Sequence, residues 1–373
     1  MRTVGDSPAM HHVEATYESM RDNPRAIRLG LATVTDGFSP LGLSRKSYSI
    51  WPVMVINYNI PPWLATKKDH MMLSLIIPGP KKPSTMDVYL EPLVEELKLL
   101  WDGVRAYDTS TRCPREDRWF QLHAICMWTI HDSPGLGFIS GLAVSGTRGC
   151  PTCGPHLEAQ YSTPLRSTYY LGHEKYLPLD HPLRDNCTDP IPPYMSMIDY
   201  CVLEARIQAG EIPRVASGLN RLSILLELPY WDGLLIQHLG DAMHEEGNVV
   251  KTLLQHIWGK VDTLNHRHAC VEFARGTWGK GLKTHDFHKL IQDIIPIVMV
   301  DLGNDNLRKA IWALSKLLRW VCNKEIRLDE VDAMHECRAS THDVAVVQGD
   351  LPYFGKMEQI LKIYFGSTKF RLL

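Results

Sequence analysis

Two apolar segments that each lead into an aspartate constrain the fold of this chain most strongly. The first begins at Ile27 and leads into Asp36-Gly37, and the second begins at Ile125 and leads into Asp132. Both have the length and the apolar composition of buried strands. Two more strand-like segments and one amphipathic helix lie between them. The predicted order is therefore strand, strand, strand, helix, strand.

The intervening segments can be bounded from their residues. Residues 48–57 predict a second strand, in which Pro52 indicates a sheet edge or a bulge. Residues 71–77 predict a third strand, which Pro-Gly-Pro ends. Apolar residues recur at helical spacing over 90–101, and Pro92 is expected in the first turn of that helix, where its missing N–H does no harm.

This order predicts an α/β protein with a ribonuclease-H-like mixed sheet, in which the first strand is central and the strand after the helix lies beside it. The carboxylates of Asp36 and Asp132 would then meet. Two close carboxylates resist joint ionisation unless a cation neutralises them. Two Mg²⁺ or Mn²⁺ ions would do so, and such a pair can clamp the oxygens of a displacement at phosphorus. Plainer interpretations stay open, because Asp-Gly is a common turn and an aspartate before Ser-Pro can cap a helix.

Composition narrows the class of protein. The chain has 373 residues, of which 45% are hydrophobic and 22% charged, as in globular proteins. Its net charge of −2 gives no overall basic field for nucleic acid, although local basic patches stay compatible with it. No 18-residue apolar run and no signal-peptide core are visible, so we expect an intracellular protein that does not enter a membrane.

Cysteine and histidine spacing suggests a zinc site. Cys150 and Cys153 form a C-x-x-C pair, which can supply two ligands of a tetrahedral Zn²⁺. The remaining ligands must come from elsewhere, and His156, His173 and His181 follow downstream. The alternative is a reduced thiol pair in a loop, since nine cysteines without a secretory signal do not indicate a disulfide framework.

Polar motifs also occur in the C-terminal part, which has the pattern of helices. Asp241 and His244 would face the same way in a first helical turn, where they could support the active site or where Asp241 could merely cap the helix. A polar cluster could contact DNA phosphate or support the fold, and we expect the second; it consists of Lys283, His285, Asp286 and His288. Residues 307–322 predict an amphipathic core helix with a basic, solvated face.

Several blocks of the sequence resemble transposases of plant CACTA (En/Spm-type) DNA elements, the tnp2-like family. The first-aspartate block reads Leu-Gly-Leu-Ala-Thr followed by Thr-Asp-Gly-Phe-Ser-Pro-Leu-Gly. The resemblance extends in family order from about residue 25 to about residue 300. Further blocks that carry it are 48–53, 58–63, 72–80, 87–97, 128–134, 150–154, 177–182, 241–248 and 282–288.

The resemblance implies a DDE-type transposase core with a ribonuclease-H-like fold and metal-dependent cleavage and transfer of DNA strands. Asp36 and Asp132 match the first two acidic residues of the family, and the surroundings of His173 and His181 resemble its pattern. The implied partners are transposon ends, target DNA, a second element-encoded DNA-binding protein and further copies of the chain, all in the nucleus. Because no helix-turn-helix is visible, we expect another segment or a partner to recognise the terminal repeats.

The third acidic residue is the point at which this sequence departs from the family. The family has a glutamate on a late helix, and the segment 351–362 resembles that region but places Gly355 at the expected position. Glu358 lies three residues further on, about one helical turn away, and is a weak candidate. The alternatives are therefore an inactive, transposon-derived DNA- or protein-binding module, or another ribonuclease-H-like nuclease that does not join strands.

The predicted organisation has four parts. An N-terminal extension is followed by the catalytic α/β core, then by an insertion with the zinc knuckle, and finally by a helical portion whose end is divergent or truncated. In residue numbers these parts are 1–24, 25–150, 151–240 and 241–373.

Overall fold

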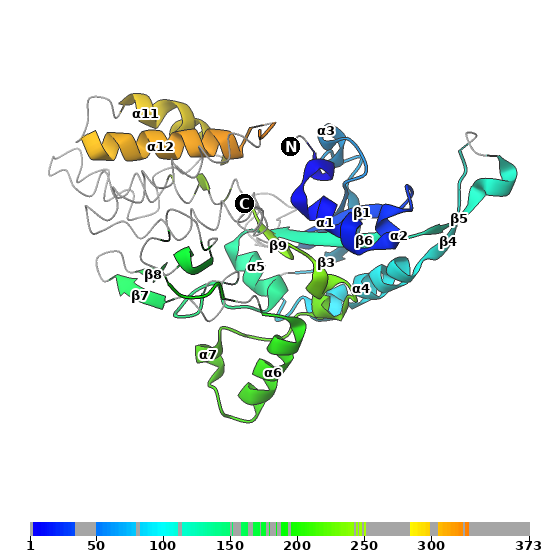
Figure 1. Cartoon of the computed structure of the whole chain (residues 1–373), viewed down its shortest axis with the longest axis horizontal. Helices are drawn as coiled ribbons and strands as arrows, with labels where there is room; N and C mark the ends of the chain where they lie inside the picture. Colours follow the sequence, from blue (N-terminus) through cyan, green and yellow to red (C-terminus); the bar gives the residue numbers. More distant parts are fainter. Residues whose placement is uncertain are drawn as a thin grey trace. The chain divides into compact units, whose positions relative to one another are not determined.

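The computed structural model divides the chain into two units, which we call the N-terminal unit (residues 3–240) and the C-terminal unit (residues 241–361). Figure 1 shows the elements of both. Within the part of the chain that the structure describes, no helix is both long enough and apolar enough to cross a membrane. The described residues are 3–33, 50–79, 83–110, 114–149, 195–241, 284–298, 305–323 and 325–327, together with 151, 158–162, 167–171, 173–176, 179, 184, 188–192, 244, 246–247 and 250.

A five-stranded mixed sheet forms the centre of the N-terminal unit. Its order is β3-β2-β1-β6-β9. The first three strands in the chain pair antiparallel, β1 with β2 and β2 with β3. The other two pairs, β1 with β6 and β6 with β9, are parallel. The strands are β1 (Ile27–Thr33), β2 (Trp51–Asn57), β3 (Met72–Ile77), β6 (Ala124–His131) and β9 (His238–Gly240).

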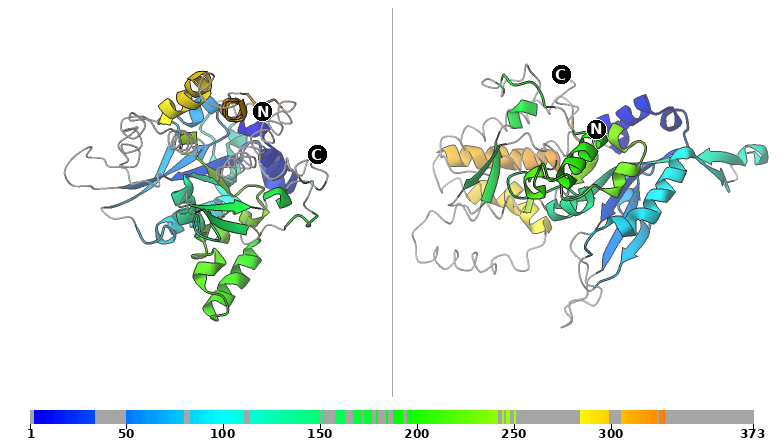
Figure 2. Two further views of the ribbon diagram at one scale, coloured as in Figure 1. Left: turned by 90° about the vertical axis from the view of Figure 1, so that its left-hand side faces the viewer. Right: turned by 90° about the horizontal axis from the view of Figure 1, so that it is seen from below.

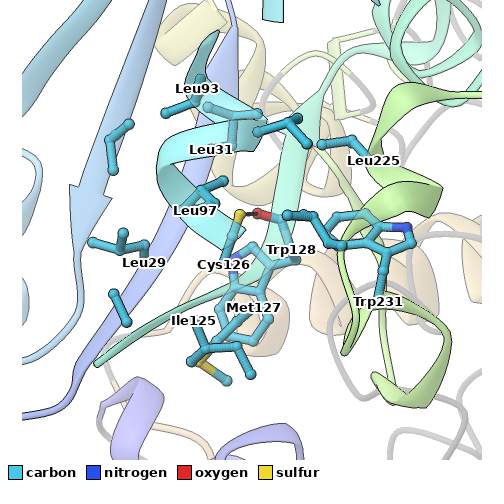
Figure 3. Packing of buried hydrophobic residues seen from close by; sticks show 14 of the residues in the cluster. Leu29, Leu31, Leu93, Leu97, Ile125, Cys126, Met127, Trp128, Leu225 and Trp231 are labelled. Atoms are coloured by element: carbon cyan, nitrogen blue, oxygen red, sulfur yellow. Dashed lines mark hydrogen bonds between the residues drawn. The ribbon is translucent and has the colours of Figure 1, made fainter. Parts of the chain in front are cut away.

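The interior strand β6 is buried on both faces, which explains its continuous apolar sequence. Helix α4 (Asp87–Asp102) packs its apolar stripe against this part of the sheet. Leu29 and Leu31 of β1 lie with Leu93 and Leu97 of α4 in the same buried cluster (Figure 3). Successive strand residues point to opposite faces, and Arg28 accordingly reaches the Met20 carbonyl oxygen at 2.7 Å. The segment that contains α1 (Pro8–Thr16) and α2 (Glu18–Arg21) therefore packs against β1, and Tyr17 between these helices also packs edge-on against Trp101 of α4.

The sequence pattern located these elements but misplaced two details. All four predicted strands and the predicted helix are present, so the mixed α/β class is confirmed. Pro92 is inside α4 and not in its first turn, because the helix begins already at Asp87. Pro52 lies in an interior strand, next to a register shift between Val53 and Met54, so the bulge is confirmed and the sheet edge is wrong.

Smaller elements surround the sheet. The hairpin of β4 (Val104–Tyr107) and β5 (Trp119–Leu122), which the sequence analysis did not predict, extends away from the sheet (Figure 1 and the right-hand view of Figure 2). Helix α5 directly follows β6. The remaining helices and strands of this unit are α3 (Pro62–Ala65), α5 (Ser133–Ser140), β7 (Glu158–Ser162), β8 (Ser167–Leu171), α6 (Met197–Gln208) and α7 (Arg214–Ser217), with 3₁₀ turns at Val4–Asp6, Arg115–Arg118, His173–Tyr176, Ile224–Glu227 and Trp231–Gly233.

The described part of the C-terminal unit is helical, as predicted. Helix α10 (Thr284–Lys289) continues through a π-helical turn at Leu290–Ile294 into α11 (Ile295–Val298). Helix α12 (Asp305–Val321) is the amphipathic helix expected from the sequence. Ile291, Ile295, Ile311, Leu314 and Leu317 are buried in this unit.

Candidate functional site

Asp132 is located at the junction between strand β6 and helix α5. Strand β6 ends at His131, and Asp132 is the N-cap of α5. Its Oδ1 accepts a hydrogen bond of 2.9 Å from the backbone N–H of Gly135. The capping interpretation of this residue is therefore confirmed. Capping of this kind needs only one carboxylate oxygen, so it is compatible with a second role for Asp132.

Asp36 lies outside the described residues, which end at Thr33 in this region and resume at Ile50. The strands that lead to the two aspartates are neighbours and run parallel, with Ala32 of β1 opposite Ile130 of β6. The carboxyl ends of parallel neighbours lie at the same edge of a sheet. The predicted adjacency of the strands is thus present, while the separation of the two carboxylates stays a prediction.

The third parallel strand leads to the D-x-x-H motif. Gly240 at the end of β9 pairs with His131 of β6, and Asp241 is the next residue in the chain. The Oδ2 of Asp241 lies 2.7 Å from Nδ1 of His244, and its Oδ1 accepts a long hydrogen bond of 3.4 Å from the His244 N–H. Both side chains face the same way, as the spacing predicted.

Polar groups within the sheet are buried or partly buried, and none of them is suited to act as a nucleophile or an acid at neutral pH. Thr129 Oγ1 and His238 Nδ1 form a hydrogen bond of 2.6 Å between β6 and β9. Burial lowers the pKa of His238 to about 4, so its imidazole is neutral at neutral pH. Burial also raises the pKa of the Cys126 thiol to about 12. A nucleophilic cysteine requires a low pKa, so Cys126 serves packing and not catalysis.

Most of the other predicted ligands cannot be placed. Cys150, Cys153, His181 and Glu358 lie outside the described residues, as does His156. His173 begins a 3₁₀ turn, but the contacts of its side chain are not described. The zinc knuckle and the third acidic residue therefore stay predictions.

One potential metal-binding cluster was missed in the sequence. Among the described residues, Glu246, His288 and Cys322 bring three ligand atoms within 4.8 Å of one another. His288 belonged to a polar cluster that was expected to support the fold, but no spacing rule connects it with a glutamate 42 residues before it or a cysteine 34 residues after it. Only the packing of the helices reveals this group.

A hairpin surface combines arginine with exposed aromatic rings. The guanidinium of Arg105 lies 4.3 Å from the ring centroid of Trp119. Tyr107 packs edge-on against the same ring at a centroid distance of 5.0 Å. Trp119 and Tyr107 are both exposed. Stacked arginines and aromatic rings on a surface are the groups that bind single-stranded nucleic acid without sequence preference.

Comparison with known proteins identifies the family of the chain. The family model described as transposase family tnp2 matches residues 1–189, just over half of the 373 residues. The match includes the sheet strands β1, β2, β3 and β6 and both aspartates of the predicted pair. No curated protein matches the chain. The chain belongs to the transposase family tnp2.

Proposed function

We propose that the chain is the core of a DDE-type transposase, which cuts DNA at transposon ends and joins the ends to target DNA. Family membership indicates DNA transposition. The observation that supports this mechanism is the strand order β3-β2-β1-β6-β9 with β1, β6 and β9 parallel. This is the arrangement expected of a ribonuclease-H-like fold, in which acidic residues after neighbouring strands share metal ions.

The proposed metal ligands are Asp36 and Asp132. Each follows a strand of the parallel pair β1 and β6 in the chain. Bound between their carboxylates, Mg²⁺ or Mn²⁺ would polarise the scissile phosphate and lower the pKa of the attacking water. The cap bond from the Gly135 N–H orients the carboxylate of Asp132 before any metal arrives. Such positioning matters because the in-line geometry of the displacement depends on it.

Asp241 and His244 are proposed to support this chemistry. Asp241 follows β9 in the chain as Asp132 follows β6, so three aspartates each come after one of the three parallel strands. The 2.7 Å contact with Asp241 fixes the orientation of the His244 imidazole. Glu358 stays the candidate for the third acidic ligand.

The hairpin of β4 and β5 is proposed to contact DNA. Arg105 can neutralise a phosphate, while Trp119 offers a ring face to an unpaired base. A double substitution Arg105→Ala and Trp119→Ala should weaken binding of single-stranded DNA at least about tenfold, since each stacked base contributes about 1–3 kcal/mol. Unchanged binding in a fluorescence-anisotropy titration would remove the hairpin from the proposed DNA path.

The decisive experiment separates the cap role of Asp132 from catalysis. Asparagine caps helices as well as aspartate does but carries no charge. Asp132→Asn should therefore keep the unfolding midpoint of the parent and abolish Mn²⁺-dependent nicking of duplex DNA that carries the transposon ends. Asp22→Asn is a matched control, because Asp22 is exposed and forms a surface ion pair with Arg21. Full nicking by Asp132→Asn would leave Asp132 as a cap alone.

The alternative function is a non-catalytic DNA- or protein-binding module of transposon origin. Gly355 at the expected position of the family glutamate favours it. This module would bind DNA but show neither nicking nor Mn²⁺ binding by calorimetry. The variant Gly355→Glu, which places a glutamate at the expected position, distinguishes the two functions further. If this variant gains Mn²⁺-dependent nicking of DNA, the rest of the catalytic site is intact.

A further inference from the structure

Three side chains of types that ligate metals meet in the C-terminal unit, and none of the three was assigned a role in DNA chemistry. The carboxylate of Glu246, the imidazole of His288 and the thiol of Cys322 each place a ligand atom within 4.8 Å of the other two. Glu246 follows the Asp241-x-x-His244 motif in the sequence, His288 belongs to α10, and Cys322 directly follows α12. Segments that are distant in the sequence thus converge on one point.

The carboxylate in this cluster is buried, and no lysine or arginine among the described residues pairs with it. Only 3% of the Glu246 side chain is exposed. Its Oε2 lies 2.7 Å from Nδ1 of His288, and its Oε1 accepts a bond of 3.3 Å from Nε2 of Gln292. A buried carboxylate is costly unless a cation or several donors compensate it. A proton on His288 can supply that charge, and so can a metal ion.

The buried residue Gln292 connects the cluster to the helices around it by hydrogen bonds. It lies in the π-helical turn Leu290–Ile294, and turns of this kind are frequent at functional sites. Its amide also donates to the Leu318 carbonyl oxygen at 3.3 Å, while its own backbone carbonyl accepts bonds of 3.0 Å from Ser315 and Arg319. Hydrogen-bonded supports like this one orient the ligands of metal sites.

We propose that Glu246, His288 and Cys322 bind one Zn²⁺ ion, with water in the fourth position. One carboxylate, one imidazole and one thiolate form a donor set that zinc accepts, whereas Mg²⁺ and Ca²⁺ prefer oxygen donors alone. Nitrogen and oxygen ligands of tetrahedral zinc lie about 3.3 Å apart if each bond is about 2.0 Å. The 2.7 Å contact between Glu246 and His288 therefore has to open by less than about 1 Å, as Zn²⁺ replaces the proton between them.

Zinc at this position would fasten the end of α12 to α10 and to the segment that contains Glu246. The proposed ligands do not include Cys150 or Cys153, and the site depends neither on DNA cleavage nor on the metal pair proposed at Asp36 and Asp132. A structural role predicts that zinc raises the unfolding temperature of the C-terminal unit, because a ligand stabilises the folded state to which it binds.

Cobalt substitution in the full chain tests the proposal. The parent for this experiment carries Cys150→Ser and Cys153→Ser, so that the predicted knuckle cannot contribute, and is freed of metal with a chelator. Titration with Co²⁺ should give the absorption of tetrahedral cobalt together with a thiolate-to-cobalt charge-transfer band, at one equivalent. Adding Cys322→Ser should remove the charge-transfer band and weaken Zn²⁺ binding at least about tenfold.

Two further variants distinguish the loss of a zinc ligand from a general effect of replacing a cysteine. Cys201→Ser removes another exposed cysteine and should leave the band unchanged. Cys322→His replaces the sulfur ligand with a nitrogen ligand and should therefore keep Zn²⁺ binding but lack the thiolate band. A parent that binds no Co²⁺ or Zn²⁺, or a thiolate band that persists in Cys322→Ser, would overturn the assignment, whatever the outcome of the nicking assays. Retained circular dichroism verifies that each variant folds.

Discussion

At the scale of single residues, His238 links stability to pH. Its folded-state pKa of about 4 lies below the ordinary value of about 6.5. Between these values the unfolded chain binds more protons than the folded one, so stability is complete above about pH 6.5 and falls as the pH drops towards 4. Titration of His238 changes the unfolding free energy by at most about 1.4 kcal/mol per pH unit. The change is smaller if water reaches the imidazole, because the residue is partly exposed.

Urea unfolding at pH 7 and pH 5 measures this contribution. His238→Asn should flatten the dependence between these two values, because the side chain no longer titrates. His12→Asn is the control, because His12 lies at the surface, where its ring forms a hydrogen bond with the Gly233 carbonyl oxygen. An unchanged slope in His238→Asn would assign the acid sensitivity to other groups.

Gly30 is a second residue whose role follows from its surroundings. A Cβ atom added there would lie 2.6 Å from the ring of Tyr58. The Tyr58 hydroxyl accepts a bond of 3.0 Å from Trp128 Nε1, and burial raises the pKa of this tyrosine to about 12. Gly30→Ala should therefore displace Tyr58 and cost about 1–3 kcal/mol in unfolding free energy. If the Tyr58 ring is what the added methyl group meets, the double variant Gly30→Ala with Tyr58→Leu should lose less unfolding free energy than the two single variants lose together.

At the scale of elements, Arg221 connects three segments of the N-terminal unit. Its guanidinium donates to Asp87 in the first turn of α4 and to the carbonyl oxygen of Phe138 in α5. The neighbouring Ser223 hydroxyl donates to the Ile139 carbonyl oxygen at 2.8 Å. About a quarter of each side chain in the Arg221–Asp87 pair is exposed. Partly buried pairs of this kind contribute more than surface pairs do.

Arg221→Leu should consequently lower the unfolding free energy by about 2–3 kcal/mol, because it removes the charged donor of the partly buried Asp87 carboxylate and a donor to the Phe138 carbonyl oxygen. Arg206→Leu is the matched comparison. Arg206 pairs with Glu211 at 3.0 Å, but more than half of each side chain is exposed, so we expect a loss below about 1 kcal/mol. Equal losses in the two variants would refute the connecting role of Arg221.

The same elements explain how far sequence reasoning reached. Strands β1 and β6 and helices α4 and α12 were predictable because burial imposes a period on their residues. The hairpin of β4 and β5 was missed because its four-residue strands are largely exposed and carry no such period. Arg221 and the Glu246 cluster depend on contacts between distant segments, which no local spacing encodes. For Asp132, the sequence supported both a cap and a metal ligand, and the structure confirms the cap.

At the scale of the whole molecule, the two units have separate apolar cores. Leu31 and Ile125 are buried in the N-terminal unit, and Ile291 and Leu317 are buried in the C-terminal unit. Truncation of a buried leucine to alanine costs about 2–5 kcal/mol, because a cavity is added to the loss of apolar burial. If each core holds one unit together, the damage from such a truncation should stay within that unit.

Calorimetry of the full chain tests this independence. We expect two unfolding transitions, of which Leu31→Ala lowers one and Leu317→Ala lowers the other, while Ile297→Ala, at an exposed position, shifts neither. A single transition that both leucine variants shift would mean that the units unfold as one body. Two transitions would also let the proposals be separated, because Zn²⁺ at Glu246, His288 and Cys322 should raise only the transition that Leu317→Ala lowers. Mn²⁺ at Asp36 and Asp132 should raise the other, and Asp132→Asn should cancel that shift alone.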